Sequence, residues 1–336
     1  IDLLYAGTET GLYVSFNGGQ LWEKFQNNLP VVPITDLMIQ DNDMIVATQG
    51  RAFWVMDDLN PLYELAEAAK VEFYVYEPED AIRDLAVRSE SMEMGQNPYE
   101  GFSLMYYLKE DSDSTDLPVE ILDASGAVLR SFTTDSEAKK GKIKKEAGMN
   151  RLHWDLAIEE FEPVEGVFSG IGVGPAKVAP GKYKAVFAYG DQQITKDLTV
   201  KPDPRWSASQ VAYDAQQAAL KPIATALVAT RKIADDLRSL RTQVKDPQSR
   251  VSKDDYSDWN TQAEDLIKSI DAIEAKLIQP KQKTFQDVIN FPNQLDAELA
   301  HIYGTIANQE PPVTDGQKAY AADMLKKYET LMKETE

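Results

Sequence analysis

The spacing of hydrophobic residues changes once along the chain, close to residue 202. Before that point short apolar runs alternate with polar residues at a period of two, and turn residues recur every 8–12 positions. From residue 207 onward, apolar residues recur three and four positions apart, as on one face of a helix. The pattern predicts a multidomain β + α protein, with strands first and helices last.

One turn in the first part has a recognisable sequence. Residues 15–22 read Ser-Phe-Asn-Gly-Gly-Gln-Leu-Trp and fit the pattern Ser-x-Asp/Asn-x-Gly-x-x-Trp. Asn and Gly tolerate the left-handed backbone of a hairpin corner, and a Trp at the start of the returning strand can pack over it. The match resembles the Asp-box (BNR) repeat of sialidase-like and sortilin-like β-propellers. The resemblance implies a structural role for Ser15, Asn17, Gly19 and Trp22.

Residues 1–66 are predicted to form six short strands, and such regular spacing fits four-stranded propeller blades. The strands are expected at 3–7, 11–16, 21–25, 34–40, 44–49 and 52–57. They supply parts of only one or two blades, which would leave long sheet edges unpaired. We therefore expect a C-terminal portion of a larger protein. Its N-terminal propeller portion would be the main partner, deleted here or carried on a separate chain.

Residues 45–59, Ile-Val-Ala-Thr-Gln-Gly-Arg-Ala-Phe-Trp-Val-Met-Asp-Asp-Leu, resemble the last blade of bacterial proteins labelled "glycosyl hydrolase, BNR repeat" or sortilin-like. The family usually has His at the position of Gln49 and Gly at the position of Ala52. Arg51 and Trp54 are candidate pocket-lining residues. The favoured alternative is that Arg51 fixes the loop by pairing with a nearby carboxylate, Asp57 or Asp58.

Residues 71–202 are predicted to form a β-sandwich, after a connector at 62–70. Residues 147–155 and 178–185 resemble an Ig-like module found in the flagellar-hook-cap protein and in many secreted enzymes, similar to fibronectin-type modules. The resemblance places Trp154 between the two sheets. The Gly- and Pro-rich span 162–180 is predicted to be a long loop that covers either the propeller or the helices.

Residues 207–336 are predicted to form an antiparallel helical bundle. Ser207 with Gln210 and Thr314 with Gln317 are expected to cap helices, and Pro222 is expected to kink or break the first helix. Residues 287–295 resemble the Asn-Phe-Pro signature of the C-terminal bundle in the same BNR family. The resemblance therefore covers nearly the whole chain and implies a secreted, periplasmic or cell-surface bacterial protein.

Composition narrows the range of functions. The chain has 336 residues, no cysteine and a formal net charge of −20. An excess of acid argues against nucleic acid and against anionic membrane surfaces. No apolar run approaches the roughly 18 residues of a membrane span, and without cysteine there is no disulfide or thiolate chemistry. A signal peptide is not recognisable in this sequence.

Sequence motifs for catalysis or metal binding are weak. The only histidines, His153 and His301, fall in different predicted domains, and a half-buried strand position is the favoured interpretation of His153. The acidic run 111–116 lacks the Gly and Glu of a calcium loop, so a solvated hairpin tip is favoured. The Gly-rich run 166–174 does not lie between a strand and a helix, so phosphate binding is not expected. We expect no metal and no cofactor.

Two functions remain open. The first, which we favour, is a non-catalytic binding or scaffold portion of a secreted, sortilin-like propeller protein with a glycan or peptide ligand. The second is the C-terminal part of a glycan or peptide hydrolase whose active site lies mostly in further propeller blades. A shared fold is a weak argument for catalysis.

Overall fold

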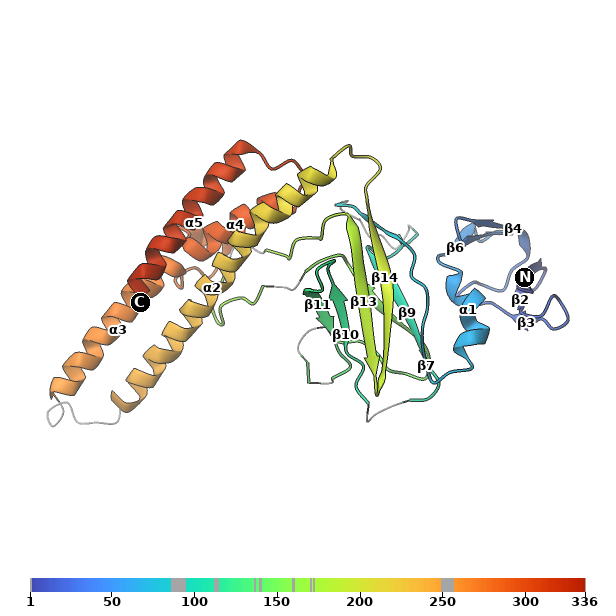
Figure 1. Cartoon of the computed structure of the whole chain (residues 1–336), viewed down its shortest axis with the longest axis horizontal. Helices are drawn as coiled ribbons and strands as arrows, with labels where there is room; N and C mark the ends of the chain where they lie inside the picture. Colours follow the sequence, from blue (N-terminus) through green and yellow to red (C-terminus); the bar gives the residue numbers. More distant parts are fainter. Residues whose placement is uncertain are drawn as a thin grey trace. The chain divides into compact units, whose positions relative to one another are not determined.

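The computed structural model describes residues 2–85, 95–111, 115–135, 137–138, 141–158, 161–169, 171, 173–248 and 257–335. Two compact units make up the chain, and each is built from segments that are distant in sequence. The first contains Ile1–Ile82, Arg88–Asp155 and Gly181–Lys201. The second contains Arg83–Val87, Leu156–Pro180 and Pro202–Glu336. The chain is mixed, with several small antiparallel sheets and a C-terminal helical region (Figure 1).

The first unit begins with two three-stranded antiparallel sheets, which we call the small sheets. One has the order β1-β2-β3 and the other β4-β5-β6. Their strands are β1 (Leu4–Thr8), β2 (Gly11–Ser15), β3 (Glu23–Lys24), β4 (Ile34–Gln40), β5 (Asp43–Thr48) and β6 (Phe53–Met56). Gly7 permits close approach of the sheets, because a Cβ there would lie 2.6 Å from Cγ2 of Ile34. The shared core is Leu12, Leu29, Met44, Val46, Leu59 and Leu62.

Two larger antiparallel sheets follow helix α1 (Asn60–Ala68). One has the order β12-β9-β7, and the other is a curled half-barrel of five strands in the order β11-β10-β13-β14-β8. Their strands are β7 (Phe73–Val75), β8 (Ala81–Arg83), β9 (Phe102–Leu108), β10 (Val119–Leu122), β11 (Val128–Phe132), β12 (Gly148–Trp154), β13 (Gly181–Tyr189) and β14 (Gln192–Pro202). Trp154 is fully buried, stacks on Phe102 and meets Tyr183 of the half-barrel edge-on. Its predicted place between sheets is confirmed.

The second unit consists mainly of helices. These are α2 (Gln210–Gln248), α3 (Ser257–Leu277), the short 3-10 helix η1 (Phe285–Ile289), α4 (Leu295–Ala307) and α5 (Asp315–Thr335). α2 continues through Pro222, so of the two expected outcomes, a kink or a break, the break does not occur. The predicted cap at Ser207 is wrong: α2 begins at Gln210, and Ser209 Oγ accepts the N–H of Ala212. The cap predicted at Thr314 and Gln317 is confirmed by reciprocal bonds of 3.3 and 2.9 Å.

The long predicted loop packs on the helices of its own unit. Val164 and Ala176 are buried in the helical core, and the amide of Ala176 donates to the Tyr303 hydroxyl at 3.0 Å. Arg83, at the end of β8, also contacts this loop and the helices. Its guanidinium donates to Val178 O, to Glu310 at 2.7 Å and to Gln216, and it lies over the ring of Tyr213. The helices therefore fold together with distant parts of the chain.

Candidate interaction surface

The corner at residues 15–22, at the end of β2, is held by its own side chains. Ser15 Oγ donates to Asn17 Oδ1 at 3.0 Å and accepts the amide of Gly19 at 2.9 Å. Asn17 Oδ1 also accepts the amide of Leu21 at 2.8 Å. Gly19 has φ +89°, and a Cβ there would lie 3.7 Å from the indole of Trp22. The polar atoms of Ser15 and Asn17 are thus used within the turn, which leaves the corner a structural feature.

The loop between β5 and β6 is fixed by backbone groups. Trp54 Nε1 donates to the carbonyl of Arg51 at 2.9 Å, and Thr48 Oγ1 donates to the carbonyl of Ala52 at 2.6 Å. Trp54 packs against the core of the small sheets, whereas Arg51 is exposed. No carboxylate among the described residues forms an ion pair with Arg51. Its carbonyl, rather than its charge, shapes the loop.

The sheet β4-β5-β6 has two apolar faces. Strand register places Leu37, Val46 and Trp54 in one row, on the face that packs into the core. The next row, Met38, Ile45 and Val55, lies on the other face, together with Ala47 and Phe53. We call these five residues the outer face of β4–β6. Phe53, Val55 and Met38 are 77, 57 and 51% exposed. A sheet with one solvated face normally carries polar residues there.

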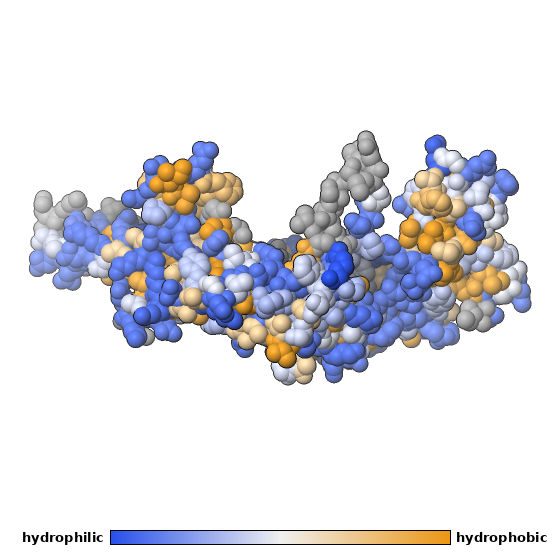
Figure 2. All heavy atoms as spheres, turned by 90° about the horizontal axis from the view of Figure 1, so that it is seen from above, coloured by the Kyte–Doolittle hydropathy of each residue, from blue (hydrophilic) through white to orange (hydrophobic). Residues whose placement is uncertain are grey.

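The outward residues of β1-β2-β3 are more polar. Register aligns Ala6 with Tyr13 and Lys24. The hydroxyl of Tyr13 lies 3.4 Å from that of Thr10. Figure 2 shows apolar side chains gathered over the small sheets. The outer face of β4–β6 contains Phe53, the most exposed apolar side chain of the small sheets, and is therefore a candidate interaction surface.

A group of carboxylates lies where the small sheets meet α1 and was not predicted from the sequence. Burial raises the pKa of Asp58, and burial followed by repulsion from Asp43 raises the pKa of Asp57. The Arg151 guanidinium opposes both shifts. Asp43 Oδ1 accepts the amide of Asp58 at 3.0 Å. Alternating strand patterns do not show that these residues, from three segments, come together.

Most of these carboxylates accept hydrogen bonds that hold turns and loops together. Asp58 has φ +55° and accepts the amide of Asn60 at 3.1 Å, so it forms the turn into α1. Glu79 accepts side-chain amides from Asn42 at 2.8 Å and from Asn60 at 3.1 Å. No set of three or more metal-binding side chains occurs among the described residues. The acidic loop at 111–116 is described only in part, since residues 112–114 lie outside the described residues.

The two histidines belong to different units. His153 is half-buried on β12, as predicted: its Nδ1 lies 3.2 Å from Ser103 Oγ, and its ring stacks on Tyr99 with centroids 3.6 Å apart. Burial, and then Arg151, lower the pKa of His153, which favours the neutral ring. His301 is exposed on α4, with its ring near Tyr320.

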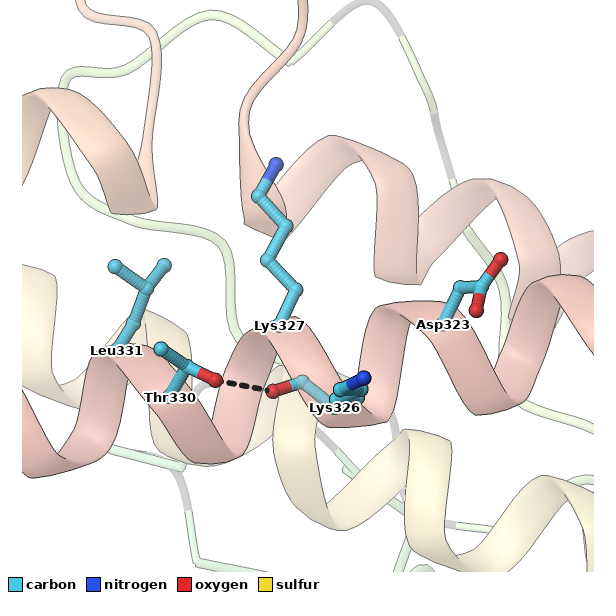
Figure 3. A pocket seen from close by; sticks show the side chains of 5 residues that line it. All are labelled: Asp323, Lys326, Lys327, Thr330 and Leu331. Atoms are coloured by element: carbon cyan, nitrogen blue, oxygen red, sulfur yellow. Dashed lines mark hydrogen bonds between the residues drawn. The ribbon is translucent and has the colours of Figure 1, made fainter.

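A shallow hollow of about 300 Å³ lies on α5 and is lined by that helix alone. Figure 3 shows Lys327 extending away from the helix, with Asp323 one turn before it. Thr330 Oγ1 donates to the carbonyl of Lys326, so its hydroxyl is engaged within the helix. No candidate catalytic set lines this hollow. None of the described helices is long and apolar enough to cross a membrane.

Comparisons with known proteins add little. No family model matches the chain, and no curated protein matches it. One solved structure that matches is the C-terminal domain of wzt, at 13% identity. The match covers 32% of this chain and 67% of that chain, with a TM-score of 0.17. A likeness at this level carries no argument about function.

Proposed function

We propose that this chain is the C-terminal portion of a secreted, sortilin-like BNR propeller protein with a binding or scaffold role. The two small sheets would belong to its last blades, the Ig-like sandwich and the helical bundle would brace them, and the ligand would be a glycan or peptide. The Asp-box sequence at 15–22 and the last-blade sequence at 45–59 support this assignment by resemblance.

The observation that carries the proposal is the outer face of β4–β6. A propeller blade packs between two neighbours, so both of its faces need to be apolar. β5 and β6 contain the continuous apolar runs Met-Ile-Val-Ala and Phe-Trp-Val-Met, as expected of strands covered on both sides. Only one of these faces is packed in the small-sheet core. We infer that another β-sheet covers the second face in the complete protein.

The chain has no cysteine, so a single introduced thiol can report whether this face is covered. Phe53→Cys should react rapidly with a maleimide in the present chain. It should react at least tenfold more slowly in a longer gene product that also carries further Asp-box repeats. Val228→Cys, at an exposed site on α2, is the matched control and should react equally fast in both. Equal reactivity at position 53 in both polypeptides would contradict the proposal.

The hydrolase alternative places the active site mostly in further blades; within the described residues, the carboxylates near Arg151 are its candidate contribution, because a raised pKa is a feature of a general acid. Asp43, Asp58 and Glu79 are engaged in turns and side-chain amide bonds, which favours a structural role. Turnover of glycan or peptide by the longer protein, lost in Asp57→Asn, would establish the hydrolase and overturn the binding role.

A further inference from the structure

The loop between α3 and α4 presents three apolar side chains to solvent. Phe285, Val288 and Ile289 of η1 are 74, 44 and 83% exposed, and we call them the η1 knob. They lie in and next to the segment 287–295 that carries the Asn-Phe-Pro sequence. Burying three neighbouring apolar side chains would be favourable, so their shared exposure requires an explanation.

Polar bonds hold this loop in one conformation. Asp287 Oδ2 accepts the amides of Lys283 at 2.6 Å and Thr284 at 2.9 Å, and these bonds keep the pKa of Asp287 low. Gln282 is buried, and its amide donates to the carbonyl of Phe291 at 2.5 Å. The ring of Phe285 rests edge-on against Phe168, with centroids 5.2 Å apart. The knob is therefore preorganised and does not need to be ordered on binding.

The segment that carries the knob has more lysines than carboxylates, although the chain as a whole is acidic. Lys281 and Lys283 are exposed and form no ion pair within the described residues. Lys276 pairs with Glu334, which places the end of α5 beside the end of α3, the helix that leads into the knob. Segment 276–294, which contains the knob, has three lysines and one carboxylate, Asp287, in a chain of net charge −20. The positive charge is thus local.

The amount of apolar surface distinguishes between possible occupants. Three side chains of this size bury on the order of 400 Å² at most, whereas a stable protein interface needs about 800 Å² from each partner. Insertion into the headgroup region of a bilayer needs only a few apolar side chains with cations beside them. Acidic groups elsewhere on the chain are screened beyond about 8 Å at physiological salt.

We propose that the η1 knob inserts into the interfacial region of an anionic bilayer, with Lys281 and Lys283 on the lipid phosphates. The proposal concerns peripheral contact by one loop and is independent of the propeller assignment. It also refines the expectation from net charge: the acidic total argues against membrane contact, but the charge around the knob favours it. The knob would hold the helical unit at a lipid surface.

The test uses Ile289→Cys, labelled with an environment-sensitive fluorophore as the single thiol of the whole chain. The probes are phosphatidylcholine vesicles with and without about 30% phosphatidylglycerol. With the anionic vesicles the emission should shift to shorter wavelength, and about 0.5 M salt should weaken the effect because the lysine contacts are screened. Val228→Cys, labelled in the same way on α2, should show no shift. An unchanged spectrum at position 289 would overturn the proposal.

Unlabelled variants test the same proposal by cosedimentation with the anionic vesicles. Phe285→Ser combined with Ile289→Ser should reduce binding at least tenfold, and Lys281→Glu combined with Lys283→Glu should reduce it severalfold. Val211→Ser combined with Val228→Ser, which alters two exposed apolar residues of α2, should bind as the parent does. Far-UV circular dichroism verifies that each variant is folded. If the knob residues instead control self-association in sedimentation velocity and the chain ignores vesicles, a second copy is the occupant and the proposal fails.

Discussion

The small sheets and the helical unit handle their polar and apolar groups in opposite ways. The helical unit buries charge and satisfies it: Arg231 pairs with Asp296 at 2.7 Å, and Arg83 pairs with Glu310. The small sheets bury little that is polar apart from Ser15, and expose Phe53, Val55 and Met38 instead. An apolar face in water is unfavourable for an isolated sheet, whereas a buried charge is tolerated when it is paired and hydrogen-bonded.

This contrast shows which region is self-sufficient. The helical core is extensive and includes residues of the 156–180 loop, although Val211 and Leu240 of α2 remain exposed. The small sheets share a core of six residues and leave one sheet face uncovered. We infer that the helical unit is stabilised from within and that the small sheets depend on a neighbour.

The largest expected effect is a loss of stability of the helical unit when Arg83 is replaced. Arg83→Met leaves Glu310 and Gln216 without their buried donor, and the loss of one partner of a buried pair typically costs about 3–5 kcal/mol. Urea unfolding, followed by the far-UV helix signal, should show this loss. Arg51→Met, at an exposed arginine, is the matched control and should change the free energy of unfolding by less than about 0.5 kcal/mol.

A second variant separates loss of the pair from loss of shape. Arg83→Met combined with Glu310→Met removes both charges and should recover much of the stability, because a buried ion pair can often be replaced by apolar groups. If the single variant unfolds like the parent chain, the Arg83 cluster does not hold the helical unit together.

The order of strands and helices could be predicted from local patterns, because period two and period 3.6 are set by backbone geometry. The cap at Thr314 and the burial of Trp154 were predicted correctly for the same reason. The cap was predicted at Ser207, but the serine two residues later, Ser209, has the same hydroxyl and caps the helix. Arg83 and Glu310 lie 227 positions apart, so no local pattern brings them together.

Only part of the candidate surfaces could be predicted from the sequence. The continuous apolar runs of β5 and β6 do indicate strands with two apolar faces, and that signal could have identified the outer face of β4–β6. The prediction that Arg51 pairs with Asp57 or Asp58 failed, because its side chain is exposed and its carbonyl makes the bond. The exposure of Ile289 depends on how α3 and α4 pack, which residue spacing does not specify.

A smaller effect is expected in the small sheets, whose stability should depend on pH through Asp58. Burial raises the pKa of Asp58, so the folded state holds a proton that the unfolded chain has already released. This contribution is greatest below the unfolded pKa of about 3.9 and is lost as pH rises through the folded pKa. The small sheets should therefore gain local stability as pH falls from neutral into that window.

Asp58→Asn tests this pH dependence directly. Asparagine tolerates the left-handed backbone and can still accept the amide of Asn60, so the turn is preserved. At neutral pH it should raise the free energy of local opening by less than about 1 kcal/mol after allowing for solvent screening, and it should flatten the pH profile. Hydrogen exchange at the amide of Leu59, which donates to Asn42, is the local reporter. If Asp58→Asn keeps the pH profile of the parent, a group other than Asp58 causes the pH dependence.

The smallest effect on stability is expected from substitutions on the outer face of β4–β6. Phe53→Thr combined with Val55→Thr places β-branched side chains at both positions of β6 and removes apolar area that is already in water, so the free energy of unfolding should change by less than about 0.5 kcal/mol. Dye binding and self-association at high concentration should nevertheless fall, because both depend on the outer face of β4–β6. Val14→Thr, on the buried face of β2, is the contrasting variant and should destabilise by about 1–3 kcal/mol. Equal losses of stability for the inner and outer substitutions would mean that Phe53 and Val55 are already packed within this chain, and the face would need no neighbour.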